Sequence, residues 1–157
     1  MFTYPFKMVS ATATILLIHN DDVLLGRRAS KEEKVFAGWL SLPGGFLNAD
    51  EETIEQCAMR ETFEETALRI EECRLNLFHI SSGPKTDPRA HVINACYWVK
   101  INDYERSVAK PGDDLSELTF VNYKELIENR IELAFDHITI AKKGIKDYGF
   151  FLGKKMS

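Results

Sequence analysis

The sequence has few cysteines, no long hydrophobic run and no excess of positive charge. Its three cysteines, Cys57, Cys73 and Cys96, are an odd number without C-x-x-C spacing. This argues against a disulfide framework or a zinc site and favours buried, reduced thiols. The longest apolar stretch near the N-terminus, residues 15–18, is far too short to span a membrane. Because no signal-peptide pattern is present either, we expect a cytoplasmic protein.

The charge balance narrows the class of ligand. The formal net charge is -4, whereas proteins that bind a nucleic-acid backbone are usually basic. We therefore expect neither nucleic acid nor a membrane as a partner. A small anionic ligand stays compatible with this charge, because a few local arginines or a metal ion can hold it. The 157 residues, 45% hydrophobic and 28% charged, fit one globular domain over residues 1–157.

Hydropathy and turn signals predict strands mixed with helices. We expect strands at 11–19, 23–27, 39–42, 75–80, 92–101 and 117–122. We expect helices from about 50 to 67, at 123–129 and at 135–148. Loops are expected at 29–38, 81–90 and 107–116, and a tight turn at 43–45. The nearly continuous apolar run at 92–101 is typical of a central strand buried on both faces. These elements predict an α/β (α+β) fold, an α/β/α sandwich with a mixed central sheet.

The segment 42–68, LPGGFLNADEETIEQCAMRETFEETAL, carries the clearest sign of chemistry. Asp50 is a good N-cap for its helix. At 100° per residue, Glu61, Glu64 and Glu65 fall within one arc of about 100°. The same arc carries the apolar residues Ile54, Cys57, Ala58 and Leu68. Carboxylates on an apolar face are costly to desolvate unless a cation meets them, so we expect a divalent metal ion there.

The alternative interpretation of this helix is a solvated surface helix with i,i+4 pairing, such as Arg60 with Glu64. Taken alone, the pattern R-E-x-x-E-E is common on such helices. The apolar residues on the same arc and the preceding Gly44-Gly45 pair favour a functional site.

The segment resembles the signature of the Nudix hydrolases, G-x5-E-x7-R-E-U-x-E-E-x-G-U, in which U is a bulky aliphatic residue. It departs from that signature at three places. One extra residue lies in the loop after the glycine, Thr62 replaces an aliphatic residue, and Ala67 replaces the last glycine. Ala67 costs little if the helix continues one residue further. The matching residues are Gly45, Glu52, Arg60, Glu61, Glu64, Glu65 and Leu68.

Two further segments resemble bacterial ADP-ribose pyrophosphatases. Residues 85–92 read KTDPRAHV and residues 133–138 read LAFDHI, similar to the G-x-D-P-R-G-H-V and L-A-F-D-H stretches of that subfamily. Ala90 replaces the usual glycine. The resemblance implies a Nudix pyrophosphohydrolase that acts on a phosphorus anhydride. The implied reaction converts ADP-ribose to AMP and ribose 5-phosphate.

The resemblance also implies roles for the box residues. Glu61, Glu64 and Glu65 are expected to hold Mg²⁺, or Mn²⁺ in its place, with the Gly45 carbonyl as a further ligand. Arg60 is expected to hold these acids in position.

The general base is left open between one of the helix acids and an acid from the later loop. Glu117 is our candidate from that loop, with Asp113 and Asp114 behind it. The alternative interpretation of all three is a solvated acidic loop.

Cationic and aromatic residues are candidates for substrate contacts. Arg27, Arg28 and Arg89 are expected to bind the phosphates, close to Gly44 of the Gly-Gly turn. The alternative for each arginine is a surface ion pair. His137 has no metal-ligand spacing to another histidine, and we interpret it as structural. An adenine ring needs an aromatic or apolar slot; the candidates, each more often a core residue, are Phe6, Phe36, Phe46 and Trp98.

Two other functions compete with the ADP-ribose pyrophosphatase. One is a Nudix pyrophosphatase for another substrate: a nucleotide sugar, a dinucleotide or a nucleoside triphosphate. The other is a non-catalytic sensor of an ADP-ribose-type ligand. We expect the enzyme rather than the sensor because the box acids are present and the net charge is -4. Relatives are often dimers, so a homodimer with a contribution from the apolar lead-in, residues 1–8, is a further expectation.

Overall fold

The computed structural model describes residues 3–30, 34–112 and 114–156, so Asp113 lies outside the described part. Seven strands form one sheet in the order β3-β2-β1-β6-β5, with β4 paired to β1 and β7 paired to β2. The strands are β1 (Ser10–His19), β2 (Asp22–Arg28), β3 (Leu40–Ser41), β4 (Gly44–Phe46), β5 (Asn76–Gly83), β6 (Val92–Lys100) and β7 (Leu115–Asn122). The helices are α1 (Ile54–Thr66), α2 (Asp103–Val108), α3 (Tyr123–Ile127) and α4 (His137–Phe151), with a short 3-10 turn, η1, at Glu72–Arg74.

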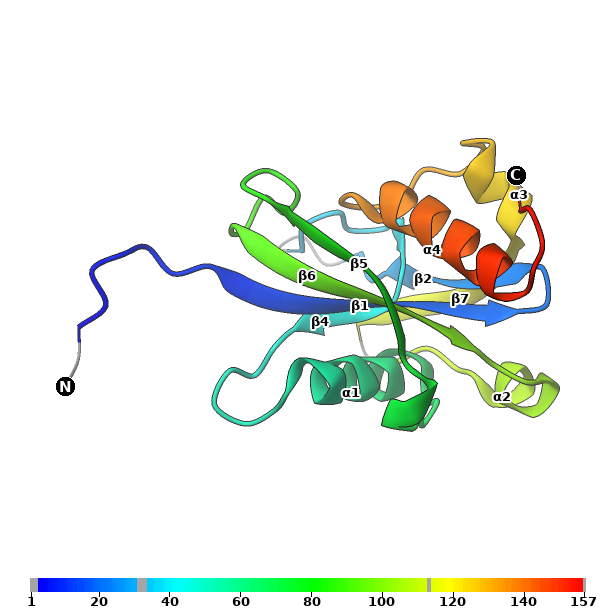
Figure 1. The fold of residues 1–157 in the computed structure, drawn as a ribbon, viewed down its shortest axis with the longest axis horizontal. Helices are drawn as coiled ribbons and strands as arrows, with labels where there is room; N and C mark the ends of the chain where they lie inside the picture. Colours follow the sequence, from blue (N-terminus) through cyan, green and yellow to red (C-terminus); the bar gives the residue numbers. More distant parts are fainter. Residues whose placement is uncertain (1–2, 31–33, 113, 157) are drawn as a thin grey trace.

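Helices cover both faces of the sheet (Figure 1). α1 and α2 lie on one side, and α3 and α4 lie on the other. β1 runs parallel to β6, opposite Val92–Lys100, and antiparallel to β2 and β4. This confirms the predicted sandwich with a mixed central sheet. Within the described residues, no helix combines the length and apolar character needed to cross a membrane.

Alternation along β1 builds two separate cores. Leu16 and Ile18 face α4, while Ile15 and Leu17 face α1. All four are at most 2% exposed, as expected for a strand with helices on both sides. The chain thereby fixes α1, which carries the acids, against the middle of the sheet.

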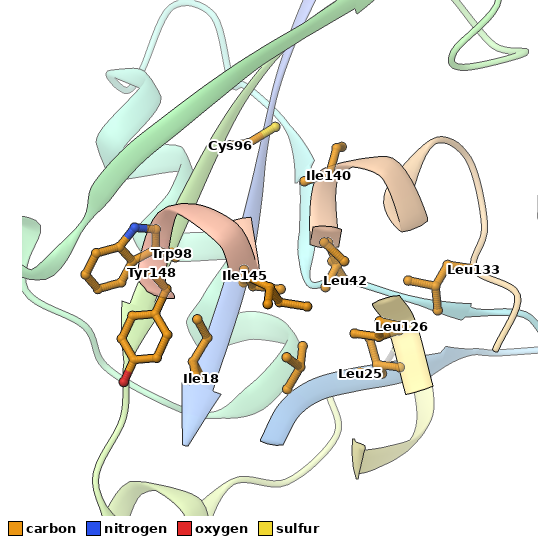
Figure 2. Packing of buried hydrophobic residues seen from close by; sticks show 13 residues of the cluster. Ile18, Leu25, Leu42, Cys96, Trp98, Leu126, Leu133, Ile140, Ile145 and Tyr148 are labelled. Carbon is orange, nitrogen blue, oxygen red and sulfur yellow. The ribbon is translucent and has the colours of Figure 1, made fainter. Parts of the chain in front are cut away.

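The core under α4 contains one of the aromatic candidates for the substrate slot (Figure 2). Trp98 packs against Tyr148 with ring centroids 5.1 Å apart, and its indole N–H donates to Asp147 over 2.7 Å. The Trp98 ring is therefore part of the core.

Three local predictions are wrong. α1 begins after Thr53 and not at Asp50, because Thr53 and Gln56 form a reciprocal capping box. The segment Gly44–Phe46 is a strand and not a turn, because it pairs with Thr12–Thr14 of β1. α2 occupies Asp103–Val108, where no helix was predicted and whose last two residues fall in the predicted loop 107–116; a capping box on its N-cap residue again explains the helix.

The C-terminus of α1 also differs from expectation. The helix ends at Thr66, and Ala67 adopts a left-handed conformation with φ 61°, so the helix does not continue as supposed. Thr62 is fully buried, and its hydroxyl donates to the Ala58 carbonyl over 2.7 Å. The substituted threonine therefore carries no unpaired polar group.

The strained cap at Ala67 gives a stability prediction. Ala67→Gly should raise the free energy of unfolding by roughly 0.5–1 kcal/mol, because glycine removes a left-handed penalty of about 1–2 kcal/mol but adds unfolded-state entropy. Urea unfolding measures this. Ala109, the C-cap of α2, has φ -60° and serves as the matched control, since Ala109→Gly should destabilise. Equal losses for both variants would contradict the assignment of strain.

Candidate active site

Two adjacent glycines bring the backbone of β4 against β1 and α1. A Cβ atom at Gly44 would overlap the Ala13 carbonyl oxygen, and one at Gly45 would overlap the Glu61 carboxylate. At Gly44 the obstacle is backbone, so only glycine leaves room there, whereas at Gly45 the obstacle is the end of the Glu61 side chain, which can shift. The extra residue relative to the Nudix signature lies in the loop between β4 and α1, where it does not disturb this contact.

Two of the helix acids point to the cavity beside these glycines. Glu65 accepts a hydrogen bond from the Gly44 N–H over 3.0 Å, and burial raises its pKa to about 8. Burial also raises the pKa of Glu61, whose side chain is 13% exposed. Glu64 differs, since its side chain is 54% exposed and does not line the cavity. The sequence predicted three desolvated acids on one face. In the structure only Glu61 and Glu65 line the cavity, and Glu64 is exposed beside them.

Arg60 ties the acids to the loop. Its Nε and one terminal nitrogen donate to both oxygens of Glu52 over 2.9 and 2.8 Å. The other terminal nitrogen donates to Glu61 over 2.7 Å and to Glu64 over 3.0 Å. A further bond reaches the Phe46 carbonyl over 2.9 Å. Arg60 thus contacts Glu52, Glu61 and Glu64 at once, and its role in positioning these acids stays a prediction.

The Glu52–Arg60 pair gives a pH prediction. Hydrogen bonding by Arg60 lowers the pKa of Glu52 from 4.5 to about 2. Because the folded pKa lies below the unfolded one, this contribution to stability is present above pH 4.5 and is lost as the pH falls towards about 2. In urea unfolding, the stability gap between the wild type and Glu52→Gln should shrink steadily across that window. A gap that is constant with pH would contradict the pairing.

The site lies in a cavity of about 470 Å³ at the edge of β1 and β4. It combines carboxylates, guanidinium groups and backbone of the Gly-Gly strand. Segments far apart in the sequence meet there: α1, the loop between β5 and β6, and the start of α4. The predicted site residues that line it are Arg28, Gly44, Gly45, Arg60, Glu61, Glu65 and Arg89.

Two arginines of the cavity, Arg28 and Arg89, pack against aromatic rings. Arg89 donates from Nε and a terminal nitrogen to both oxygens of Asp87, over 3.0 and 2.7 Å. Its guanidinium lies 4.7 Å from the Phe46 ring centroid and 5.2 Å from that of Phe135. Arg28 lies 5.1 Å from the same Phe135 centroid. Both charges are thus preorganised for an anionic ligand.

Two predicted site residues lie elsewhere. Arg27 and Glu117 form an ion pair of 2.6 Å between β2 and β7, and neither lines the cavity. Their side chains are 42% and 51% exposed. Asp114 does line the cavity and pairs with Lys34. The structure therefore brings Asp114, and not Glu117, to the acids of α1.

Aromatic side chains extend the cavity. Phe46 lines it, and Phe36 lines an adjoining pocket of about 600 Å³ together with Phe135. The rings of Phe36 and Phe135 are 4.8 Å apart. Phe6 is 70% exposed, in the N-terminal lead-in. Phe135 and Asp87 line the cavity but were not among the predicted site residues. Both lie in the segments 85–92 and 133–138, whose resemblance to ADP-ribose pyrophosphatases was the signal that could have found them.

The acids suit a divalent metal ion. Among the described residues, no three His, Cys, Asp or Glu side chains converge as a ready metal cluster, because Glu61 turns to Arg60 and Glu65 turns to the Gly44 N–H. Carboxylate oxygens and the Gly45 carbonyl are the hard donors that Mg²⁺ and Mn²⁺ prefer. A cation would stabilise the charged form of Glu65, a partly buried carboxylate whose pKa burial raises.

Comparison with known proteins assigns the family. The model of the NUDIX domain matches residues 8–143. The chain therefore belongs to the NUDIX family, which confirms the family predicted from the signature.

Solved structures agree with this assignment. A MutT/nudix family protein from Enterococcus faecalis is 26% identical, with a TM-score of 0.78 over 94% of this chain and 64% of that one. A bifunctional NMN adenylyltransferase/ADP ribose pyrophosphatase from Francisella tularensis, complexed with AMP and a Mn ion, is 25% identical, with a TM-score of 0.73 over 88% and 42%.

A third structure shares the fold. It is the NUDIX domain of Shewanella oneidensis NrtR complexed with ADP ribose, with 21% identity and a TM-score of 0.78 over 93% of this chain and 94% of that one. The chain thus spans under two thirds of the Enterococcus and Francisella proteins and nearly all of the NrtR domain.

Proposed function

We propose that this chain is a metal-dependent Nudix pyrophosphohydrolase that cleaves a nucleoside diphosphate linked to another moiety, with ADP-ribose as the preferred substrate. The observation that carries the proposal is the shared cavity. The partly buried Glu61 and Glu65 lie in the same 470 Å³ space as Arg28 and Arg89. A diphosphate bridged by a cation needs both kinds of group.

In the proposed hydrolysis, the arginines and the acids of the cavity have separate roles. A water oxygen forms a bond to one phosphorus, the phosphorus–oxygen bond of the bridge breaks, and the products are AMP and ribose 5-phosphate. Arg28 and Arg89 bind the phosphoryl oxygens. Glu61, Glu64 and Glu65 would hold Mg²⁺, which when bound would supply charge neutralisation and a lower pKa for water.

One of the α1 carboxylates accepts the proton of the attacking water in this proposal. Glu61 and Glu65 are the candidates for that step, because both line the cavity in which the diphosphate would lie. Glu117 stays a prediction for which the structure offers no path, since its carboxylate pairs with Arg27 outside the cavity.

The preference for ADP-ribose has two supports. The segments 85–92 and 133–138, which resemble ADP-ribose pyrophosphatases, contribute Asp87, Arg89, Phe135 and His137 to this one cavity. In addition, the relatives from Francisella and Shewanella are an ADP ribose pyrophosphatase and a domain complexed with ADP ribose.

A substrate panel tests the proposal. Purified protein with Mg²⁺ or Mn²⁺ is offered ADP-ribose, NADH, a nucleotide sugar and nucleoside triphosphates, and products are separated by chromatography. The proposal expects AMP to form fastest from ADP-ribose. Faster turnover of another compound would support the hydrolase activity but would contradict ADP-ribose as the preferred substrate. Binding of ADP-ribose without turnover of any compound would favour the sensor.

A further inference from the structure

One side chain in the cavity has a nitrogen that the proposed reaction does not yet use. His137 is the first residue of α4, is 8% exposed and lines the cavity. Its ring centroid lies 5.2 Å from that of Phe135, the ring against which Arg28 and Arg89 also pack. The sequence suggested only a structural residue, so the position of its two ring nitrogens adds new information.

The hydrogen bond to one nitrogen fixes the tautomer. The backbone N–H of Leu42 donates to Nδ1 over 3.0 Å. A nitrogen that accepts a hydrogen bond carries no proton, so the ring proton of neutral His137 is on Nε2. Burial, followed by the charge of Arg28, lowers the pKa of His137 to about 3, with Asp87 acting in the opposite direction and Arg89 in the same one. The ring is therefore neutral at physiological pH.

The second nitrogen is a donor with no protein acceptor. Among the described residues, Nε2 of His137 makes no hydrogen bond. In the part of the chain that the structure describes, every fully buried side-chain nitrogen or oxygen has a hydrogen-bond partner. Because Nε2 of His137 has none, this atom is accessible, and the cavity that His137 lines is the space that it faces. The neighbouring carboxylate of Asp87 is already occupied, because it accepts three hydrogen bonds from Arg89.

We propose that Nε2–H of His137 donates a hydrogen bond to an oxygen of the bound substrate, which makes His137 a specificity-determining residue. This inference rests on the proposed function. The acceptor is a phosphoryl or hydroxyl oxygen, because the adjacent guanidinium groups of Arg28 and Arg89 favour an oxygen-rich, anionic ligand. The Leu42 bond and the Phe135 ring hold the imidazole in advance, so little conformational entropy is lost on binding.

The same ring also supports the backbone of the site. Leu42 precedes Pro43 and Gly44, and the Gly44 N–H donates to Glu65. Removal of the whole imidazole would therefore disturb the acids as well. A test of the donor has to keep the bond at Nδ1 and change only Nε2.

Two substitutions separate the nitrogens. In His137→Asn the amide oxygen can take the place of Nδ1 and still accept from Leu42, but no donor reaches the position of Nε2. In His137→Gln the longer amide places an N–H near that position. His79→Asn is the matched control, because His79 lies on β5 beside Lys143 and does not line the cavity.

We expect His137→Asn to lower kcat/KM by about 10- to 100-fold, as for loss of a hydrogen bond to a charged oxygen. His137→Gln should recover part of this loss, and His79→Asn should match the wild type. Thermal unfolding checks that the three variants are folded. A folded His137→Asn protein with kcat/KM within about twofold of wild type would overturn the proposal.

Nitrogen NMR of the histidine rings tests the donor in the wild-type protein, whatever the variants do. We expect the His137 signals to show protonated Nε2 in the free protein, and the Nε2–H resonance to shift on titration with ADP-ribose without metal. Inorganic pyrophosphate is the second probe: a shift with both ligands identifies a phosphoryl acceptor, and a shift with ADP-ribose alone identifies a hydroxyl. Protonated Nδ1, or no shift with either ligand at saturation, would overturn the inference.

Failure of the proposed function is distinguishable from failure of this inference. The variant ratios are measured on whichever diphosphate the wild type hydrolyses fastest, so a different substrate leaves the test intact. If no compound is hydrolysed, the proposed function fails, whereas the NMR titration still reports whether the ring donates to a bound ligand.

Discussion

Glu64→Gln should lose turnover by on the order of 100-fold or more while the fold stays intact. One nitrogen of Arg60 contacts both Glu61 and Glu64, so a divalent ion that displaces this nitrogen would meet both carboxylates. An amide is a weaker, uncharged ligand for Mg²⁺. The fold should tolerate the change because the Glu64 side chain is 54% exposed, and exposed ion pairs contribute under about 1 kcal/mol. Steady-state kinetics against Mg²⁺ concentration measures the effect.

The control for this prediction lies on the same helix. Glu55→Gln removes a carboxylate in the first turn of α1, away from the cavity lining, and should keep wild-type kcat and metal dependence. Normal turnover by Glu64→Gln would show that Glu64 is not a metal ligand.

Arg60→Ala should be the most destabilising single change in the site. It would leave Glu52 and Glu61, whose side chains are 9% and 13% exposed, without their cation. Breaking a buried ion pair from one side costs about 3–5 kcal/mol. Because the Arg60 side chain is itself 26% exposed, we expect about 2–4 kcal/mol, measured by urea unfolding without metal, together with loss of activity.

Arg130 offers a comparison with exposed partners. It pairs with Glu125 and Glu128, and all three side chains are at least 35% exposed. Arg130→Ala should change the free energy of unfolding by under about 1 kcal/mol. An equal effect of the two substitutions would show that Arg60 is only a surface residue, as in the alternative interpretation of the helix.

The sequence predicted the elements that periodicity and composition determine. The apolar runs of β1 and β6 and the acidic helix α1 lie close to their predicted places. The predictions failed where a side-chain hydrogen bond or a sheet contact decides the outcome. Thr53 displaced Asp50 as N-cap through its bond with Gln56, and Gly44–Phe46 became a strand because β1 offered it a pairing edge.

The same division holds for the site. Local spacing on one helix was sufficient to group Arg60 with Glu61 and Glu65. Residue spacing could not predict contacts between distant segments. Glu117 pairs with Arg27 on the neighbouring strand and so lies outside the cavity. His137 accepts a hydrogen bond from Leu42, 95 positions away in the sequence. The chain order gives no sign of such partners, and only His137 lies in a segment, 133–138, whose resemblance offered a signal.

The most direct test of the account is hydrolysis of ADP-ribose in ¹⁸O-labelled water, with Mg²⁺ present, followed by ³¹P NMR and mass spectrometry. We expect AMP and ribose 5-phosphate in equal amounts, with one ¹⁸O atom in the phosphate of one of the two products. We also expect Glu64→Gln to form neither product at a comparable rate. Unlabelled products, release of orthophosphate as the primary product, or equal rates for the variant and the wild type would contradict the account.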